Sequence, residues 1–164
     1  MPVIGVDPGT AITGFGIVEE CSSGSLKTLE YGVIRTSSGM KSEERLASIY
    51  NQLNEIVERF AIESAAIERL FFQKNAKTAL SVGEARGVIL LSFAHNHIPI
   101  FEYNPVDIKQ AITGYGQADK PQIQQMVKIL LGLAEIPRPD DAADALAIAI
   151  CHIHHKSLSD YFPT

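Results

Sequence analysis

Tryptophan is absent from this chain of 164 residues, and cysteine occurs only twice, at Cys21 and Cys151. Two cysteines so far apart make neither a disulfide framework nor a metal-binding spacing, so we expect free thiols in a reducing compartment. No apolar run approaches the ~20 residues of a membrane-spanning helix. The N-terminus lacks a basic stretch followed by an apolar segment, so no signal peptide is predicted. These absences predict a cytoplasmic protein with no membrane partner.

An excess of basic residues is also lacking. The formal net charge is −5, which taken alone argues against a nucleic-acid partner. The distribution of charge indicates otherwise, because seven basic and four acidic residues lie between Arg69 and Lys128, a local balance of +3. A local basic face can bind phosphates despite a negative total, and a bound metal ion would add positive charge.

Length and a hydrophobic content of 46% fit one domain over residues 1–164 with a substantial core. Turn-forming residues separate three strands near the N-terminus, which we expect to form an antiparallel meander: 3–6, 13–18 and 26–35. Helices then alternate with short strands. The expected helices are 42–60, 75–94, 121–131 and an apolar helix from 142, and the expected strands are 65–67 and 98–101. This order predicts an α/β domain with a mixed sheet.

Helix ends give three further expectations. Ser42 and Asp140 are candidate N-caps of the first and last helices. The five histidines, which include His95 and His97, suggest a zinc site, but the three near the C-terminus are better explained as the end of the last helix, where a cationic side chain suits the helix dipole. They are His152, His154 and His155.

Four acids occupy positions where the expected strands end and the last helix begins. Asp7 follows one strand and opens the turn Asp7-Pro8-Gly9-Thr10, and Glu68 follows another. Asp141 and Asp144 are three residues apart and therefore lie on one helix face. Clustered carboxylates repel unless a hard cation holds them, and Mg²⁺ prefers such oxygen ligands. The pattern predicts metal-dependent phosphodiester chemistry.

Each of these acids also has an ordinary explanation. Asp7 by itself starts a common turn, and a glutamate such as Glu68 is common after a short strand. The turn is also similar to one that sugar kinases and actin-like ATPases use, in which small residues and the hydroxyls of Thr10 and Thr13 would let a phosphate approach the backbone. Asp141 and Asp144 could be common N-terminal helix acids. Asp140 competes with Asp141 as a metal ligand.

Aromatic and basic residues near these acids are candidate DNA contacts. Phe71 and Phe72 follow Glu68, and each is either a core residue or a side chain that stacks on an unpaired base. Three lysines would then contact phosphates, although any one alone is more often a surface charge: Lys74, Lys109 and Lys120.

Several motifs in register along nearly the whole chain carry a resemblance to a known family. They are Gly5-Val6-Asp7-Pro8-Gly9 with Thr13-Gly14-Phe15-Gly16, Ala66-Ile67-Glu68 with Phe71, Lys74-Asn75-Ala76, Gly83-Glu84-Ala85-Arg86-Gly87, Phe101-Glu102-Tyr103, Val106-Asp107-Ile108-Lys109-Gln110, Gly114-Tyr115-Gly116 and Asp141-Ala142-Ala143-Asp144-Ala145-Leu146-Ala147. The chain resembles the RuvC Holliday-junction resolvases, bacterial endonucleases of the ribonuclease H-like fold.

The resemblance implies a central mixed five-stranded sheet flanked by helices, and a homodimer that nicks two opposing strands of a four-way DNA junction. It assigns metal binding to Asp7, Glu68, Asp141 and Asp144, base stacking to Phe71, and contacts near the scissile phosphate to Lys109, Lys120 and Lys74. We expect two Mg²⁺ ions, for which Mn²⁺ could substitute. RuvA and RuvB are implied as partners, and the helix 75–94 is our candidate dimer interface, unless it is a two-sided core helix.

Two other functions remain open. One is a ribonuclease H-like nuclease that acts on RNA, related to the YqgF family; the residues from 68 to 77 and the chain length argue against it. The other is a non-catalytic nucleotide-binding module, like half of an actin-type ATPase. Such proteins normally hold ATP between two such domains, and this chain has room for one.

Overall fold

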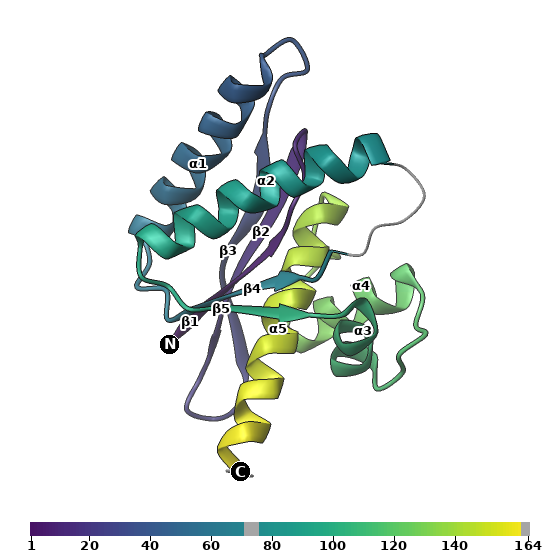
Figure 1. Ribbon diagram of the computed structural model, residues 1–164. Coiled ribbons are helices and arrows are strands. Elements are labelled where there is room, and N and C mark those ends of the chain that lie inside the picture. Colours follow the sequence, from purple (N-terminus) through teal and green to yellow (C-terminus); the bar gives the residue numbers. More distant parts are fainter. Residues whose placement is uncertain (71–75, 162–164) are drawn as a thin grey trace.

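The structure is a computed structural model that describes residues 1–70 and 76–161 (Figure 1). Its strands are β1 (Pro2–Asp7), β2 (Ile12–Glu20), β3 (Leu26–Arg35), β4 (Ser64–Glu68) and β5 (Ile100–Tyr103). They form one sheet in the order β3-β2-β1-β4-β5. β1, β2 and β3 pair antiparallel, whereas β4 runs parallel to its neighbours β1 and β5. The predicted meander and the mixed five-stranded sheet are therefore confirmed.

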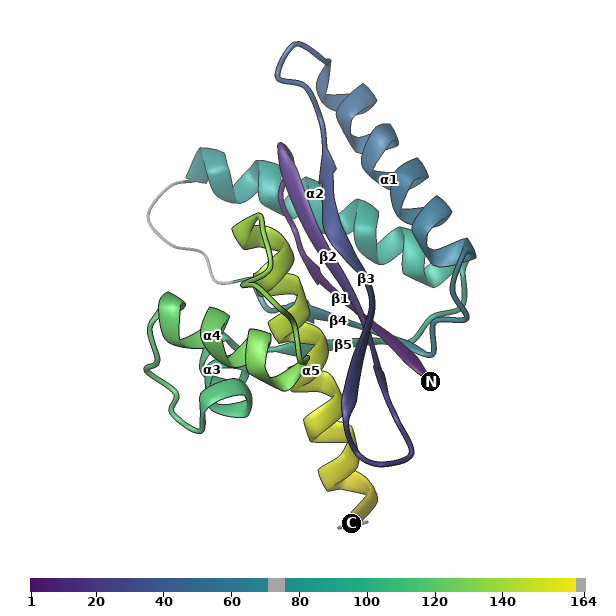
Figure 2. The same ribbon diagram turned by 180° about the vertical axis from the view of Figure 1, so that it is seen from behind.

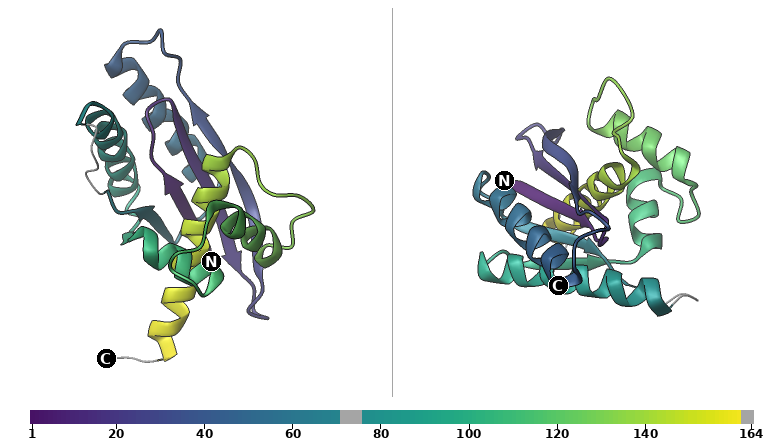
Figure 3. Two further views of the ribbon diagram at one scale, coloured as in Figure 1. Left: turned by 90° about the vertical axis from the view of Figure 1, so that its right-hand side faces the viewer. Right: turned by 90° about the horizontal axis from the view of Figure 1, so that it is seen from above.

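Helices cover both faces of this sheet. They are α1 (Ser42–Glu58), α2 (Ala76–His95), α3 (Pro105–Thr113), α4 (Lys120–Leu130) and α5 (Asp140–Tyr161). α1 and α2 form one layer, while α5 crosses the opposite face and carries α3 and α4 on its outer side (Figures 2 and 3). Within residues 1–70 and 76–161, no helix combines the length and the apolar character needed to span a bilayer.

Alternation along β1 divides the core into two clusters. Successive side chains of a strand point to opposite faces, and Ile4 and Val6 pack on the side of α1 and α2, together with Phe93. Val3 points the other way and packs in the cluster that contains Ala149 of α5. β1 is consequently buried on both faces, which explains why its sequence is almost continuously apolar.

Glycines allow α5 to lie directly on the sheet. A Cβ atom at Gly5 would lie 2.1 Å from the carbonyl oxygen of Ala145, and one at Gly14 would lie 2.0 Å from that of Asp141. Real Cβ atoms do not approach oxygen this closely, so only glycine permits this contact. The first turns of α5 are thereby held against β1 and β2.

Two elements differ from the sequence-based expectation. α3 was not predicted, although Asn104 followed by Pro105 is a helix-start signal; the backbone N–H of Asn104 donates to Asp107 Oδ2 at 3.3 Å. The strand predicted at 98–101 lies two residues later, because the Ile98 N–H donates to Phe93 O at 2.9 Å in the turn that follows α2.

The predicted N-caps were also misplaced by one residue. Ser42 is the first residue of α1, and the cap position is Lys41, whose N–H donates to Glu44 Oε2 at 3.1 Å. α5 already includes Asp140, and the Ala142 N–H donates to Pro139 O at 3.0 Å.

Candidate active site

Asp7 and Glu68 meet at one edge of the sheet. β1 and β4 are parallel neighbours, and Val6 pairs with Ile67. The residues that follow each of them, Asp7 and Glu68, therefore leave the sheet side by side. The two acids line a common hollow of about 340 Å³ together with Pro8 and Arg69.

The third and fourth acids come from α5. The close contact of α5 with Gly5 and Gly14 brings its first turns beside the end of β1. Asp141 and Asp144 consequently face Asp7 closely enough for both of their charges to raise its pKa. Three separate elements thus bring four carboxylates together, as the sequence predicts.

Burial and mutual repulsion dominate the electrostatics of this cluster. Burial, followed by the charges of Asp144, Glu68 and Asp141, raises the pKa of Asp7 to about 7. Burial and the charge of Asp144 also raise the pKa of Glu68. Burial raises the pKa of Asp144, although Lys120 opposes that shift. The carboxylates therefore lack enough compensating positive charge.

Two of the predicted lysines lie at the cluster. Lys120 Nζ is 3.0 Å from Asp144 Oδ2, and the charge of Lys109 acts on Glu68 to lower its pKa against the larger effect of burial. Both lysines line a second hollow of about 240 Å³ with Glu68 and Asp144. The other predicted DNA contacts, Phe71 and Lys74, lie outside the described residues, as does Phe72.

Asp140 occupies a different environment from Asp141. Its Oδ1 accepts hydrogen bonds from Arg138 Nη1 at 2.9 Å and from Gln124 Nε2 at 3.1 Å, and its Oδ2 is 3.5 Å from Lys120 Nζ. Asp141, but not Asp140, is among the charges that raise the pKa of Asp7. The geometry therefore favours Asp141 as the member of the carboxylate cluster.

Comparison with known proteins identifies the family. The family model described as crossover junction endodeoxyribonuclease RuvC matches residues 3–152. The chain belongs to the RuvC family. It is 55% identical to RuvC of Caldicellulosiruptor saccharolyticus over 157 residues, which cover 96% of this chain and 95% of that protein. It is 56% identical to RuvC of Chloroflexus aurantiacus, over 94% of this chain and 93% of that one.

Solved RuvC structures share the fold of this RuvC-family protein. Thermus thermophilus RuvC in complex with a Holliday junction substrate matches with a TM-score of 0.89 and 34% identity over 96% of both chains. The yeast mitochondrial Holliday junction resolvase Ydc2 matches with a TM-score of 0.71 at 15% identity, covering 98% of this chain and 82% of that one, which supports the fold alone. The predicted ribonuclease H-like fold and family are therefore confirmed.

The donor chemistry of the RuvC-family cluster suits a hard divalent cation. All four candidate ligands offer carboxylate oxygens, the type that Mg²⁺ and Mn²⁺ prefer. Among the residues that the structure describes, however, no three acidic, histidine or cysteine side chains are already close enough to hold an ion. An ion would have to draw the carboxylates together and compete with Lys120 for Asp144.

Arg69 is a neighbouring residue that the sequence analysis did not single out. It follows Glu68 directly, and its backbone N–H donates to Tyr103 O at 2.8 Å, extending the β4–β5 pairing. Its Nε lies 3.6 Å from Glu102 Oε2 and its side chain is half exposed. In the sequence, the position of a basic residue directly after the candidate ligand Glu68 would have indicated Arg69 as a neighbour of the site.

The threonines after Asp7 form hydrogen bonds within the protein. The Thr13 hydroxyl, which is fully buried, donates to Gly9 O at 2.6 Å. The Thr10 hydroxyl donates to Ser81 O at 2.8 Å and ties the turn to α2. Both hydroxyl hydrogens are used within the protein, so these side chains fix the turn that presents Asp7.

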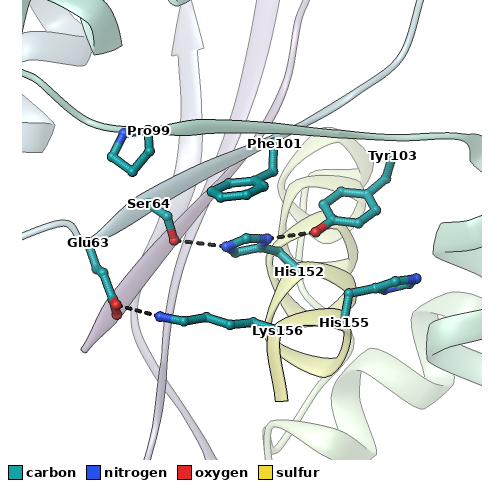
Figure 4. Close-up of a pocket in the computed structure, with 8 residues that line it drawn as sticks. All are labelled: Glu63, Ser64, Pro99, Phe101, Tyr103, His152, His155 and Lys156. Carbon is teal, nitrogen blue, oxygen red and sulfur yellow. Dashed lines mark hydrogen bonds and ion pairs between the residues drawn. The ribbon is translucent and has the colours of Figure 1, made fainter. Parts of the chain in front are cut away.

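A second polar cluster lies further along α5 (Figure 4). His152 Nε2 is 2.9 Å from Ser64 Oγ, and His152 Nδ1 is 2.7 Å from the Tyr103 hydroxyl. The ring of His152 also packs against Phe101, with 4.5 Å between centroids. A hollow of about 490 Å³ opens beside these residues, between β5 and the Glu63–Lys156 ion pair.

This cluster corrects the interpretation of the C-terminal histidines. His152 does not end the helix as a cation, because α5 continues to Tyr161 and His152 is only 2% exposed. Burial is the main cause that lowers its pKa to about 4. Ser64 is also buried, at 3% exposure. A weakly basic histidine beside a buried serine suits a structural hydrogen-bond network, not a nucleophilic site.

Proposed function

We propose that this protein is a structure-specific endodeoxyribonuclease that resolves Holliday junctions in homologous recombination and DNA repair. It would nick two opposing strands symmetrically by metal-dependent phosphodiester hydrolysis. The observation that carries the proposal is the convergence of four mutually repelling carboxylates from β1, β4 and α5. Membership of the RuvC family supports the junction as substrate, because the matching Thermus thermophilus protein is described in complex with one.

The proposed ligands of the metal are Asp7, Glu68, Asp141 and Asp144. We propose two Mg²⁺ ions per site, with Mn²⁺ as a substitute; when bound, they would supply an activated water and stabilise the leaving 3′ oxygen. Lys120 and Lys109, which line the hollow beside Glu68, would contact the DNA backbone near the scissile phosphate. The products would carry a 5′-phosphate and a 3′-hydroxyl that a ligase can rejoin.

Phe71 and Lys74 remain proposed DNA contacts. Phe71 would stack on a base where the junction can be unstacked, and such stacking is worth roughly 1–3 kcal/mol per base. Specificity would then come from junction shape more than from base-edge contacts.

Symmetric nicking requires two active sites, so we propose a homodimer. α2 supports this proposal because it presents apolar side chains on two sides: Phe93 is buried in the core, whereas Leu80 is 68% and Leu91 49% exposed. We further propose that residues 1–164 act as one nuclease domain in the cytoplasm. RuvA and RuvB, the branch-migration proteins, are the proposed protein partners.

The decisive experiment is a strand-resolved cleavage assay on a synthetic four-way DNA junction, with Mg²⁺ or with EDTA. Paired nicks at symmetric positions in two opposing strands, formed only with Mg²⁺, are expected. A folded protein that leaves the junction intact in Mg²⁺ and in Mn²⁺ would overturn the proposal. RNA substrates and ATP binding would then be tested, because they correspond to the two other functions.

Junction binding in EDTA is expected to weaken steeply with salt, because Lys and Arg contacts to phosphates release counterions. A binding constant that does not change between low and moderate salt would contradict the proposed DNA contacts.

A further inference from the structure

Lys120 is shared between two carboxylates that lie one helical turn apart. Its Nζ is 3.0 Å from Asp144 Oδ2 and 3.5 Å from Asp140 Oδ2. Asp140 and Asp144 are four residues apart on α5 and therefore lie on the same face of the helix. One of the two, Asp144, belongs to the carboxylate cluster around Asp7, whereas Asp140 does not contribute to the raised pKa of Asp7.

Asp140 is held in place independently of Lys120. Arg138 Nη1 donates to its Oδ1 at 2.9 Å, and Gln124 Nε2 donates to the same oxygen at 3.1 Å. Gln124 lies on α4, the helix that begins with Lys120, and is almost fully buried. The two hydrogen bonds use Oδ1 and leave Oδ2 directed at the ammonium. Asp140 is thus a fixed acceptor beside the site.

Stability does not explain this arrangement. The side chains of Lys120, Asp140 and Asp144 are 49%, 46% and 36% exposed. Ion pairs between side chains with this exposure contribute little to folding, because water screens their charges. The position of the ammonium is therefore the property that the pairing controls.

We propose that Asp140 is a positioning residue for Lys120, which keeps the ammonium at the active site when a metal ion takes Asp144. The proposal rests on the proposed function, in which Asp144 is a metal ligand and Lys120 contacts the scissile phosphate. A cation at Asp144 repels the Lys120 ammonium. Because Asp140 Oδ2 is already near, the ammonium moves toward it and stays beside the hollow that Lys109 and Glu68 also line.

The same geometry makes Lys120 a competitor of the metal ion. In the metal-free protein the ammonium neutralises part of the charge at Asp144, and an ion must displace it. Asp140 lowers the cost of that displacement because it offers the ammonium a second carboxylate. Removal of Asp140 therefore affects metal binding through Lys120, and the effect should depend on whether Lys120 is present.

The test is a double-mutant cycle with Asp140→Asn and Lys120→Ala, read out as Mn²⁺ affinity of the free protein by calorimetry. Asp140→Asn is expected to weaken binding about tenfold in the wild-type background, the size of an outer-shell effect. In the Lys120→Ala background most of that loss should disappear. Equal losses in both backgrounds, or no loss in either, would overturn the proposal, because independent effects add.

Cleavage supplies the second readout. In single-turnover assays at saturating junction, Asp140→Asn should slow cutting about tenfold while the junction dissociation constant in EDTA changes less than about twofold. Asp140→Glu should recover most of the rate, because it restores a carboxylate within reach of Lys120. Glu135→Gln, a loss of the same charge in the α4–α5 connection outside the Lys120 ion pairs, is the matched control and should cut like the wild type.

The proposed function and the proposed role of Asp140 can be refuted separately. A wild-type protein that does not cut junctions would refute the proposed function, and the calorimetric cycle would still decide the role of Asp140. A wild-type protein that cuts, combined with an Asp140→Asn variant that cuts at the same rate, would refute the role of Asp140 alone. Thermal melting of each variant verifies that it is folded.

Discussion

The first turns and the middle of α5 carry two polar clusters that face the same sheet and differ in how their buried groups are compensated. At its start, Asp141 and Asp144 join Asp7 and Glu68, and burial together with like charges raises the pKa of Asp7 to about 7. Near the middle of the helix, His152 is buried as a neutral ring between two hydroxyl groups. One cluster is charged and under-compensated, whereas the other is neutral and hydrogen-bonded.

The difference separates the candidate active site from a structural cluster. Buried polar groups with satisfied hydrogen bonds stabilise a fold and have no need of a ligand. Carboxylates that raise each other's pKa store unfavourable energy, which a bound cation removes. The partly neutralising contact of Lys120 with Asp144 is consistent with a site that is completed by positive charge from outside the chain.

The largest expected effect comes from Asp7→Asn. Loss of a central carboxylate should reduce junction cleavage by more than the roughly 10–100-fold that loss of an outer-shell partner causes. The fold should not suffer, because in the metal-free protein at pH 8 the Asp7 charge opposes those of its neighbours. Cleavage rate and melting temperature in EDTA are the two measurements, and the melting temperature should stay equal or rise.

A lower melting temperature together with unchanged cleavage would contradict the contrast between the two clusters. A variant that melts several degrees lower in EDTA and cuts at the wild-type rate when folded would make Asp7 a structural residue. Junction binding without metal should persist, since Asp7 carries a negative charge that repels phosphate.

His152→Ala is expected to have the second-largest effect, and on stability alone. The substitution leaves Ser64 and Tyr103 without a partner and opens a cavity beside Phe101. Both costs together amount to about 2–4 kcal/mol in the free energy of unfolding. Chemical denaturation measures this loss, while cleavage per folded molecule should match the wild type. His155→Ala is the control, because His155 is exposed on the same helix and should change stability by less than about 0.5 kcal/mol.

The sequence predicts the carboxylate cluster better than the histidine cluster, for a physical reason. Asp7 and Glu68 follow apolar strands, and parallel neighbouring strands end at one edge, so the convergence of these acids is encoded locally. The spacing of Asp141 and Asp144 gives one helix face in the same way. Their approach to β1 also depends on Gly5 and Gly14, whose role becomes evident only when α5 is seen against the strand backbones.

His152 shows why the rest was not predicted. Its partners Ser64 and Tyr103 are 88 and 49 residues away in the chain, and no local pattern connects them. The expectation that it ends a helix as a cation used only its position near the C-terminus. Asp140 illustrates the same limit, since its separation from the carboxylate cluster depends on Arg138 and on Gln124 from another helix.

The pH dependence of stability gives a second, smaller test of the neutral cluster. In the folded state the pKa of His152 is lowered from 6.5 to about 4, mainly by burial. The charges of Lys156 and His155 lower it further, whereas that of Glu63 raises it. The unfolded chain therefore takes up a proton at a higher pH than the folded protein does. The stability that this group contributes is complete above pH 6.5 and is lost as the pH falls toward 4.

Between pH 7 and pH 5 this loss should amount to about 2 kcal/mol. The free energy of unfolding measured across that range in the wild type and in His152→Ala isolates the contribution, since the variant lacks the group. Parallel pH profiles for the two proteins would show that His152 is not held neutral in the fold.

Tyr103→Phe is expected to have the smallest effect and is the most selective probe of the hydrogen-bond network. Burial raises the pKa of the Tyr103 hydroxyl to about 12, so the hydroxyl is protonated at neutral pH and can donate to His152 Nδ1. The proton of the neutral His152 ring is then on Nε2, which can donate to Ser64 Oγ. Removal of one hydroxyl should lower the free energy of unfolding by about 1 kcal/mol and leave the Phe101 contact in place. Ser64→Ala, measured alone and together with Tyr103→Phe, then tests whether the two hydrogen bonds are coupled. Losses in the free energy of unfolding that are not additive indicate one chain of hydrogen bonds through His152. Additive losses would show that the two contacts are independent.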